Sequence, residues 1–151
     1  MRHGTPPLII NSEDAKSEEK VILDKVQEWL AKGSGSNICI VARKNSIIDN
    51  RLMPLLEDNG IDCVKLDGTK PERELGDGVR VATMHRVKGL EFPNMILASI
   101  NKHTVPMELE HLTEDEGAHT LRERCLFYVA VSRARDELVV SSFGEPSVFL
   151  S

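Results

Sequence analysis

Aromatic side chains are scarce in this sequence, which has one Trp, one Tyr and four Phe among 151 residues. A surface that binds a nucleic-acid strand by stacking its bases needs several aromatic rings. Such a platform is therefore poorly supported within this chain alone. Long apolar runs are also missing: none approaches the roughly 20 residues that a membrane-spanning helix requires. We expect no membrane partner.

Cysteine and positive charge are limited as well. Cys39, Cys63 and Cys125 are odd in number, scattered, and without the spacing of metal ligands. Reduced thiols in a cytoplasmic protein are the expectation for such a pattern. The net charge of −5 gives no overall basic field for nucleic acid. Any contact with nucleic acid must come from a local patch or from another domain.

The residues that hold a nucleoside triphosphate are incomplete. A phosphate-binding loop of the form G-x-x-x-x-G-K-[ST] requires the dipeptide Gly-Lys, which occurs nowhere in the sequence. An apolar strand that ends in Asp-Glu, as needed to hold magnesium, is also missing. Asp136-Glu137 could be mistaken for such a pair, but it precedes an apolar run instead of ending one. Three histidines between residues 103 and 119 are spaced too irregularly to predict a metal site.

Apolar segments with strand and helix periodicity alternate along the chain. Ile22, Val26 and Trp29 have helical spacing, and Gly33 follows as the expected left-handed cap. Pro54 is expected to kink or restart the second helix. The predicted strands are residues 8–10, 37–42, 62–66, 79–84, 94–100 and 138–142, and the predicted helices are 15–32, 47–59 and 121–137. The alternation predicts a single α/β domain with a mainly parallel sheet and helices on both faces.

The stretch Val79–Ile100 organises the rest of the chain. It is typical of a strand, a charged turn and a second, almost wholly apolar strand. The turn over residues 83–92 has two interpretations. It is either a solvated connection or a ligand site, because polar groups at the end of a buried strand often form sites in α/β folds.

The last third of the chain is harder to interpret from its pattern. Residues 101–120 lack periodicity and contain five acids, so we expect a long, mobile surface connection. The seven apolar residues 125–131 suit a buried strand or a buried helix, and the total length of the run favours helix. On such a helix Leu126, Val129 and Arg133 share one face. Residues 146–151 form a tail.

Two stretches resemble motifs of superfamily 1 helicases of the UvrD/Rep type. Residues 83–92 match motif V as Thr-x-His-x-x-Lys-Gly-Leu-Glu-Phe. Residues 123–134 are similar to motif VI, usually Glu-Arg-Arg-Leu-x-Tyr-Val-Ala-x-Thr-Arg-Ala, with Cys125 in place of the second Arg and Ser132 in place of Thr. The resemblance implies a RecA-like three-layer sandwich over residues 1–151. It also implies the second motor domain of an ATP-dependent DNA helicase.

The family pattern is incomplete before motif V. Larger members carry a subdomain inserted near residues 67–78, where this chain has about a dozen residues, fewer than any domain needs. The resemblance therefore implies a small member without that insertion. The Asn-Tyr-Arg motif, which supplies one phosphate-binding arginine, is also missing. ATP and Mg²⁺ are expected to bind only together with a first RecA-like domain.

The resemblance assigns three residues to the nucleotide. Arg133 would act as an arginine finger on the γ-phosphate, because a planar guanidinium stabilises charge on a transferring phosphoryl group. Glu91 would accept a hydrogen bond from the ribose hydroxyl. Gly89 would permit a tight turn or a close backbone approach. The alternatives are structural: Arg133 and Arg135 complement a helix end, and Glu91 is a charge at a helix start.

Four further residues are candidates for contact with single-stranded DNA. Thr83, His85 and Lys88 match family positions near the strand, and hydroxyl, imidazole and ammonium groups all suit phosphate. Structural hydrogen bonds within the turn are their alternative. Arg43, at the end of its predicted strand, is a weaker DNA candidate. Arg124 is expected to tie motif VI to its own domain.

Two other classes of function fit the same motifs. One is a helicase-like adaptor or DNA-binding module without catalysis. The other is a helicase–nuclease subunit, against which the end at Ser151 argues weakly. In the helicase interpretation the partners are the first RecA-like domain and single-stranded DNA. The isolated chain would then be an inactive monomer that binds single-stranded DNA weakly.

Overall fold

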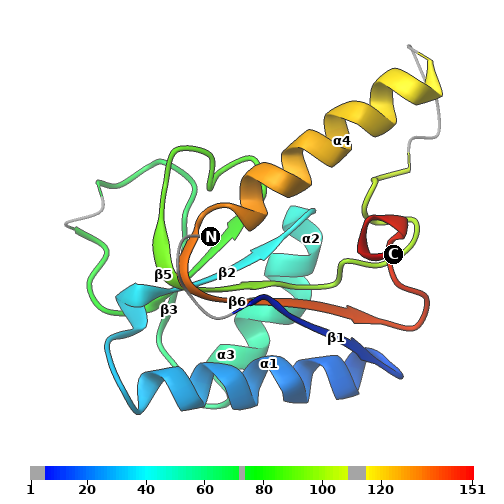
Figure 1. The fold of residues 1–151 in the computed structure, drawn as a ribbon. Helices are drawn as coiled ribbons and strands as arrows, with labels where there is room; N and C mark the ends of the chain where they lie inside the picture. The colour runs from blue at the N-terminus through cyan, green and yellow to red at the C-terminus, as the bar shows by residue number, and fades with distance from the viewer. Residues whose placement is uncertain (1–5, 72–73, 109–114) are drawn as a thin grey trace.

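A six-stranded sheet forms the centre of the computed structural model, which describes residues 6–71, 74–108 and 115–151 (Figure 1). All five strand pairings are parallel, and the order across the sheet is β1-β6-β5-β2-β4-β3. The strands are β1 (Leu8–Ser12), β2 (Ile38–Ala42), β3 (Cys63–Lys65), β4 (Val79–Thr83), β5 (Phe92–Leu97) and β6 (Ala134–Phe143). Because the strands are parallel, all their amino ends meet at one edge and all their carboxyl ends at the other.

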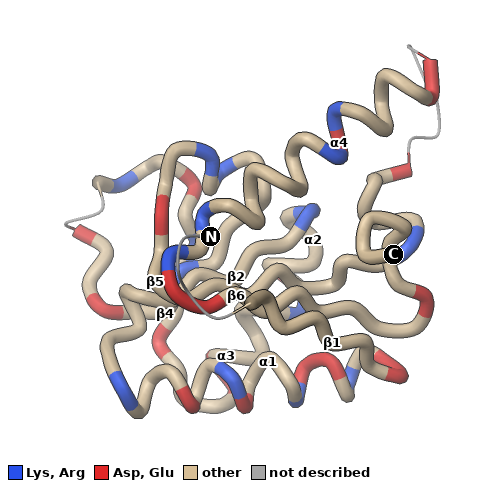
Figure 2. The backbone as a smooth tube through the Cα atoms, viewed as in Figure 1, with Lys and Arg blue, Asp and Glu red and all other residues tan. Residues whose placement is uncertain are grey.

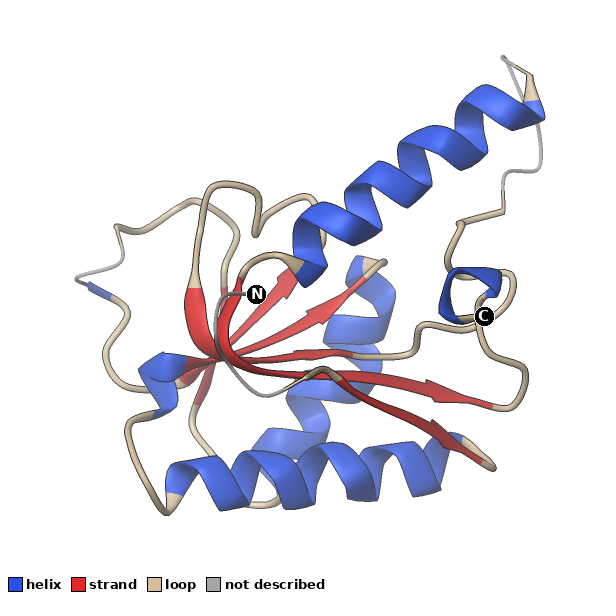
Figure 3. Cartoon of the chain, in the orientation of Figure 1, coloured by secondary structure: helices blue, strands red, loops and turns tan. Residues whose placement is uncertain are grey.

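Helices cover both faces of this sheet (Figure 3). One face carries α1 (Ala15–Leu30), α2 (Asn45–Ile47) and α3 (Met53–Asp58), and the other carries α4 (Glu116–Val131). This arrangement confirms the predicted α/β sandwich. Across the residues that the structure describes, no helix combines the length and apolar character needed to span a membrane.

The two faces have separate apolar cores. On the α1 side, Ile22 and Val26 pack with Ile40 and Val81 of the central strands. On the other side, Phe127 and Ala130 of α4 are joined by buried residues of loops, including Val87 and Val105. Strands β2 and β4 are buried along nearly their whole length, as expected for strands covered on both faces.

Helix α1 begins as the sequence predicts. The side chain of Asp14 accepts a hydrogen bond from Ser17 N at 2.8 Å, which caps the helix. Its end differs from the prediction. Ala31 is the last cap residue, with φ −68°, and Gly33 does not adopt the left-handed conformation. The predicted cap at Gly33 is therefore wrong.

Between β2 and β3 the helical segment is continuous but irregular. A π-helical turn over Ile48–Leu52 separates α2 from α3, and Pro54 lies in the first turn of α3. Pro lacks the N–H that an interior helix position would donate, so it is tolerated at a helix start. Of the two predicted effects of Pro54, a restart of the helix describes the structure. Gly60 then ends the segment with φ +71°, directly after the predicted helix 47–59.

A buried carboxylate holds α1 to the carboxyl edge of the sheet. Glu18 is fully buried and accepts hydrogen bonds from Ser99 N at 2.8 Å and Ser141 Oγ at 2.8 Å. Arg51 lies 3.1 Å from the same carboxylate and supplies the opposite charge. This pairing satisfies the rule that a fully buried charge needs a partner.

The connection between β5 and α4 is shorter than the sequence predicts. Phe143 N donates to Asn101 Oδ1 at 2.8 Å, Ser147 Oγ donates to Val105 O, and Val105 is buried. Helix α4 begins at Glu116, five residues before the predicted start, because Asp115 caps it by accepting from Ala118 N at 2.7 Å. Both described ends of 101–120 are thus packed or helical, and residues 109–114 lie outside the described chain.

Candidate functional site

The turn after β4 crosses the α4 face of the sheet from its carboxyl edge to its amino edge. It leaves β4 at Thr83, passes over the neighbouring strand β2, and enters β5 at Phe92. Met84 and Val87 are buried and hold the turn against the apolar core. The charged side chains of the turn point outward, so one connection supplies polar groups to both edges of the sheet.

Gly89 allows this turn to close. Its φ of +84° lies in the left-handed region, and a Cβ at this position would meet no atom within 4 Å. Of the two roles expected for Gly89, a conformational requirement is therefore the one that the geometry supports, because no neighbouring backbone approaches closely. Leu90 N donates to Val87 O at 2.9 Å and completes the turn.

Glu91 and Arg133 meet at the amino edge of the sheet. Each immediately precedes a strand, and β5 and β6 are neighbours with Phe92 opposite Ala134. Phe92 N donates to Arg133 O at 3.0 Å, which places the two site residues on adjacent chain segments. The Glu91 side chain is exposed, and Arg133 is partly exposed. An acidic and a basic residue from separate sequence motifs thus lie on adjacent backbone segments.

The predicted helical face that included Arg133 is wrong. Helix α4 ends at Val131, and its buried residues are Glu123, Phe127 and Ala130. Arg133 follows the cap residue Ser132, and its Nε and Nη2 lie 3.3 and 3.1 Å from Ser132 Oγ. Arg133 is therefore on the turn between α4 and β6. Its position depends on where the end of α4 lies.

Thr83 and Arg43 lie at the opposite, carboxyl edge. Thr83 ends β4 and Arg43 follows β2, the neighbouring strand, where Ala42 is opposite Thr83. Thr83 Oγ1 and O accept from Arg86 N at 3.3 and 3.1 Å, so the hydroxyl has a structural partner within the turn. His85 is exposed beside it, and Lys88 is exposed further along the crossing turn.

Arg43 is not on an open surface. Its Nε and Nη2 donate to the two carboxylate oxygens of Glu123 at 3.0 and 2.8 Å. The Arg43 side chain is 10 % exposed and that of Glu123 is 7 % exposed. A bidentate pair of this kind uses the fork of the guanidinium fully. A DNA contact by Arg43 would require this pair to open.

Glu123, and not Arg124, ties motif VI to the carboxyl edge of the sheet. Burial raises the pKa of the Glu123 carboxyl, but hydrogen bonds from Arg43 and Met107 N outweigh that effect and leave the pKa below its ordinary value. Arg124 is exposed, and its guanidinium lies 5.3 Å from the centroid of the Phe149 ring. Arg124 thus contacts its own domain, as expected, through the last turn of the chain.

Two residues of this region were not singled out by their sequence pattern. Glu123 has the same helical phase as Phe127 and Ala130, and a charge on an apolar face requires a buried partner. The sequence does not reveal this phase, because the apolar run 125–131 is compatible with more than one buried face. Arg86 is exposed after β4, and its guanidinium lies against Gly68, where a Cβ would come within 2.8 Å of it. Nothing in the spacing of Arg86 predicts this contact.

The structure thus divides the predicted site residues into two groups. Gly89, Glu91 and Arg133 lie toward the amino edge, whereas Thr83 and His85 lie toward the carboxyl edge. The six residues of β5 separate the edges by about 20 Å.

Basic and acidic residues are interspersed along the chain (Figure 2). Within residues 6–71, 74–108 and 115–151, no three His, Cys, Asp or Glu side chains form a cluster suited to a metal ion.

Comparison with known proteins relates this chain to DNA helicases. A family model described as the UvrD-like helicase C-terminal domain matches residues 70–145, half of the chain. DNA helicase II of Escherichia coli (strain K12) is 35% identical over 65 residues, which cover 43% of this chain and 9% of that protein. ATP-dependent DNA helicase PcrA of Bacillus subtilis (strain 168) is 31% identical over 103 residues, which cover 67% of this chain and 14% of that protein.

A solved structure has the same fold. The crystal structure of the C-terminal domain of a possible DNA helicase from Lactobacillus plantarum WCFS1 aligns with a TM-score of 0.76 at 21% identity, covering 99% of this chain and 81% of that one. The chain spans only about a tenth of the length of the helicases named above. Since the family model covers both the crossing turn and α4, the chain belongs to the UvrD-like helicase C-terminal domain family.

Proposed function

We propose that this chain is the second motor domain of an ATP-dependent DNA helicase, with Arg133 as an arginine finger and Glu91 as the ribose contact. The observation that carries the proposal is the meeting of these two residues at the amino edge, where Phe92 N bonds to Arg133 O. Both side chains are at least partly exposed. They are therefore available to a nucleotide bound between this domain and a first motor domain.

The chemistry of the pair fits ATP. ATP supplies the phosphoryl group whose transfer to water drives such motors. The Arg133 guanidinium would donate to the terminal phosphate oxygens as charge spreads over them, and the Glu91 carboxylate would accept from a ribose hydroxyl. We assign no magnesium ligand to this chain, so Mg²⁺ would be held with residues of the first motor domain.

The proposed surface for single-stranded DNA begins at the carboxyl edge with Thr83 and His85 and continues to Lys88 on the crossing turn. Thr83, His85 and Lys88 offer hydroxyl, imidazole and ammonium groups that suit phosphate. We leave Arg43 out of this surface because its guanidinium is taken by Glu123. The crossing turn connects the two edges directly, so a displacement of the turn at one edge would also displace its residues at the other.

Substitution of Arg133 in the full-length protein tests the proposal. A finger acts mainly in the transition state, so Arg133→Ala should lower ATP turnover about a hundredfold or more, roughly 3 kcal/mol, with a much smaller change in nucleotide binding. Arg133→Lys should fail nearly as badly, because an ammonium group cannot reproduce the guanidinium fork.

Arg135→Ala is the matched control. Arg135 lies two residues further along and is exposed on β6, with its Nε 4.0 Å from Asp136 Oδ1. Its removal should leave turnover within a few-fold of wild type. Equal losses at Arg133 and Arg135, or unfolding caused by Arg133→Ala, would contradict the finger and favour a helicase-like module without catalysis.

A further inference from the structure

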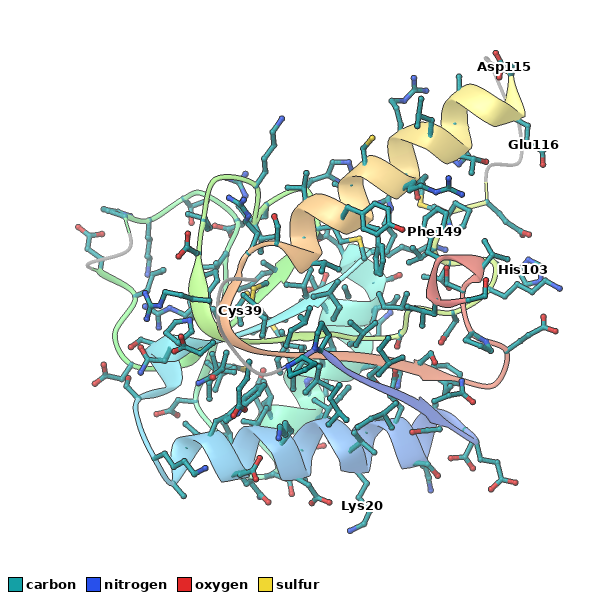
Figure 4. All side chains as sticks on the ribbon, viewed as in Figure 1. Lys20, Cys39, His103, Asp115, Glu116 and Phe149 are labelled. Carbon is teal, nitrogen blue, oxygen red and sulfur yellow. The ribbon has the colours of Figure 1, made fainter. Side chains whose placement is uncertain are left out.

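Helix α4 has little support from the sheet along much of its length. Figure 1 shows its amino-terminal half projecting away from the strands, and Figure 4 shows Asp115 and Glu116 at that far end with Phe149 beside the helix. Three of its residues are buried, and Glu123 is the one charged residue among them. The contact that Glu123 makes is therefore a large part of what fixes the helix direction.

Three separate segments meet at the Glu123 carboxylate. Arg43, just after β2, donates to both of its oxygens. Met107 N, from the connection after β5, donates to Oε1 at 2.7 Å. His119, one turn before Glu123 on α4, donates from Nε2 to Met107 O at 2.6 Å and closes the arrangement. A bidentate guanidinium fixes angle as well as distance.

The other attachment of α4 lies close to its carboxyl end. Phe127 and Ala130 pack into the core, and Ser132 then caps the helix and contacts Arg133. Nine residues of helix, about 13 Å, separate Glu123 from Ser132. Without the Glu123 pair, this stretch of α4 would be held by the contacts of His119 with Met107 O and of Arg124 with Phe149. Neither contact fixes an angle as a bidentate ion pair does. A tilt about Phe127 and Ala130 would move the turn that carries Arg133.

We propose that Glu123, held by Arg43, is a positioning residue that fixes the angle of α4 and thereby the place of the Arg133 guanidinium. The proposal rests on the function proposed for Arg133. A buried ion pair contributes little net stability compared with apolar packing, but it does impose a defined geometry. Orientation is therefore the property that this pair adds to α4.

The molecule contains a matched control. Glu18 is also buried, also pairs with an arginine and also accepts a backbone N–H. It lies on α1, which covers the opposite face of the sheet, and it makes no contact with α4 or Arg133. Glu18→Gln and Glu123→Gln are thus the same chemical change at two buried ion pairs, of which one is attached to the helix that precedes Arg133.

The experiment measures ATP turnover of the full-length protein per folded molecule. Displacement of a catalytic group by about 1 Å can cost on the order of a hundredfold, so Glu123→Gln should lower kcat roughly tenfold to a hundredfold with KM for ATP changed less than about threefold. Glu18→Gln should lower the melting temperature while kcat stays within about twofold. If Glu123→Gln does not fold, Arg43→Lys takes its place in the test. This milder change keeps the positive charge but not the guanidinium fork, and it should lower kcat several-fold.

Combination with Arg133→Ala decides between positioning and general damage. If Glu123 acts through Arg133, Glu123→Gln should cause no further loss of kcat in an Arg133→Ala background. Equal kcat losses for Glu123→Gln and Glu18→Gln, or a full additional loss in the double variant, would overturn the positioning role alone. Normal turnover in Arg133→Ala would instead overturn the proposed function itself.

Discussion

Gly89 is the residue on which the shape of the crossing turn depends. Its positive φ of +84° costs a residue with a Cβ roughly 1–2 kcal/mol, although no atom lies within 4 Å to clash with one. Gly89→Ala should therefore lower the free energy of unfolding by about 1 kcal/mol through backbone strain alone. Equilibrium unfolding in urea measures this difference directly.

Gly33 provides the comparison for that substitution. It lacks a left-handed φ, and the nearest atom to an added Cβ is Asn37 Nδ2 at 3.4 Å. Gly33→Ala should change the free energy of unfolding by less than about 0.5 kcal/mol. A loss at Gly33 as large as that at Gly89 would show that the strain argument does not hold for the turn.

At the level of single residues, the sequence could predict chemical type but not partners. The Glu91 and Arg133 candidates came from motif resemblance, and the structure places them together at one edge. The partner of Arg43 could not be predicted, because Glu123 is 80 positions away and local patterns do not identify contacts at that separation. An arginine at the end of a strand is equally consistent with a DNA contact and with a buried pair.

Among the elements, α4 departs most from its sequence prediction. Seven consecutive apolar residues, 125–131, carry no phase information, so the buried face was placed one residue too early. The buried positions are Glu123, Phe127 and Ala130, while Leu121 and Tyr128 remain exposed. Glu123 is the charged residue on the buried face, and its partner Arg43 is 80 positions away, so the sequence alone could not identify this face as buried. Strand β2 was predicted well because its apolar run suits a strand covered on both faces. Strand β4 was predicted from alternation, but the structure buries Arg80 along with its apolar residues.

The Glu123 pair should also make α4 sensitive to acid. The pKa of Glu123 in the folded protein lies below its ordinary value of 4.5, with burial opposed by the hydrogen bonds from Arg43 and Met107. A carboxyl with a lowered pKa contributes stability above its unfolded pKa, and that contribution is lost as pH falls through the folded value. Wild type should therefore lose stability relative to Glu123→Gln as pH falls below about 4.5.

Thermal unfolding between about pH 6 and pH 3 measures this dependence. Glu13→Gln is the control, because Glu13 is exposed in the turn before α1 and its removal should leave the acid-dependent loss in place. If the melting temperatures of Glu123→Gln and wild type fall in parallel with pH, protonation of Glu123 does not contribute to the loss of stability in acid.

On the scale of the whole molecule, the parallel sheet places the two groups of proposed site residues at opposite edges. Because every strand runs in one direction, the residues before β5 and β6 gather at one edge and those after β2 and β4 at the other. The crossing turn over residues 84–91 contributes to both. The edges that we propose for nucleotide and for DNA are therefore opposite edges of one domain, joined by one continuous segment.

The same arrangement leads to the prediction for the isolated 151-residue chain. It offers a guanidinium and a carboxylate to a nucleotide, but its sequence contains no Gly-Lys for a phosphate-binding loop. A finger stabilises charge on a phosphoryl group that other residues must first hold and orient. The chain alone should therefore release no phosphate from ATP above background, with or without single-stranded DNA, whereas the full-length protein in the same assay should. DNA-stimulated phosphate release by the isolated chain, abolished by Arg133→Ala, would contradict the division of the site between two domains.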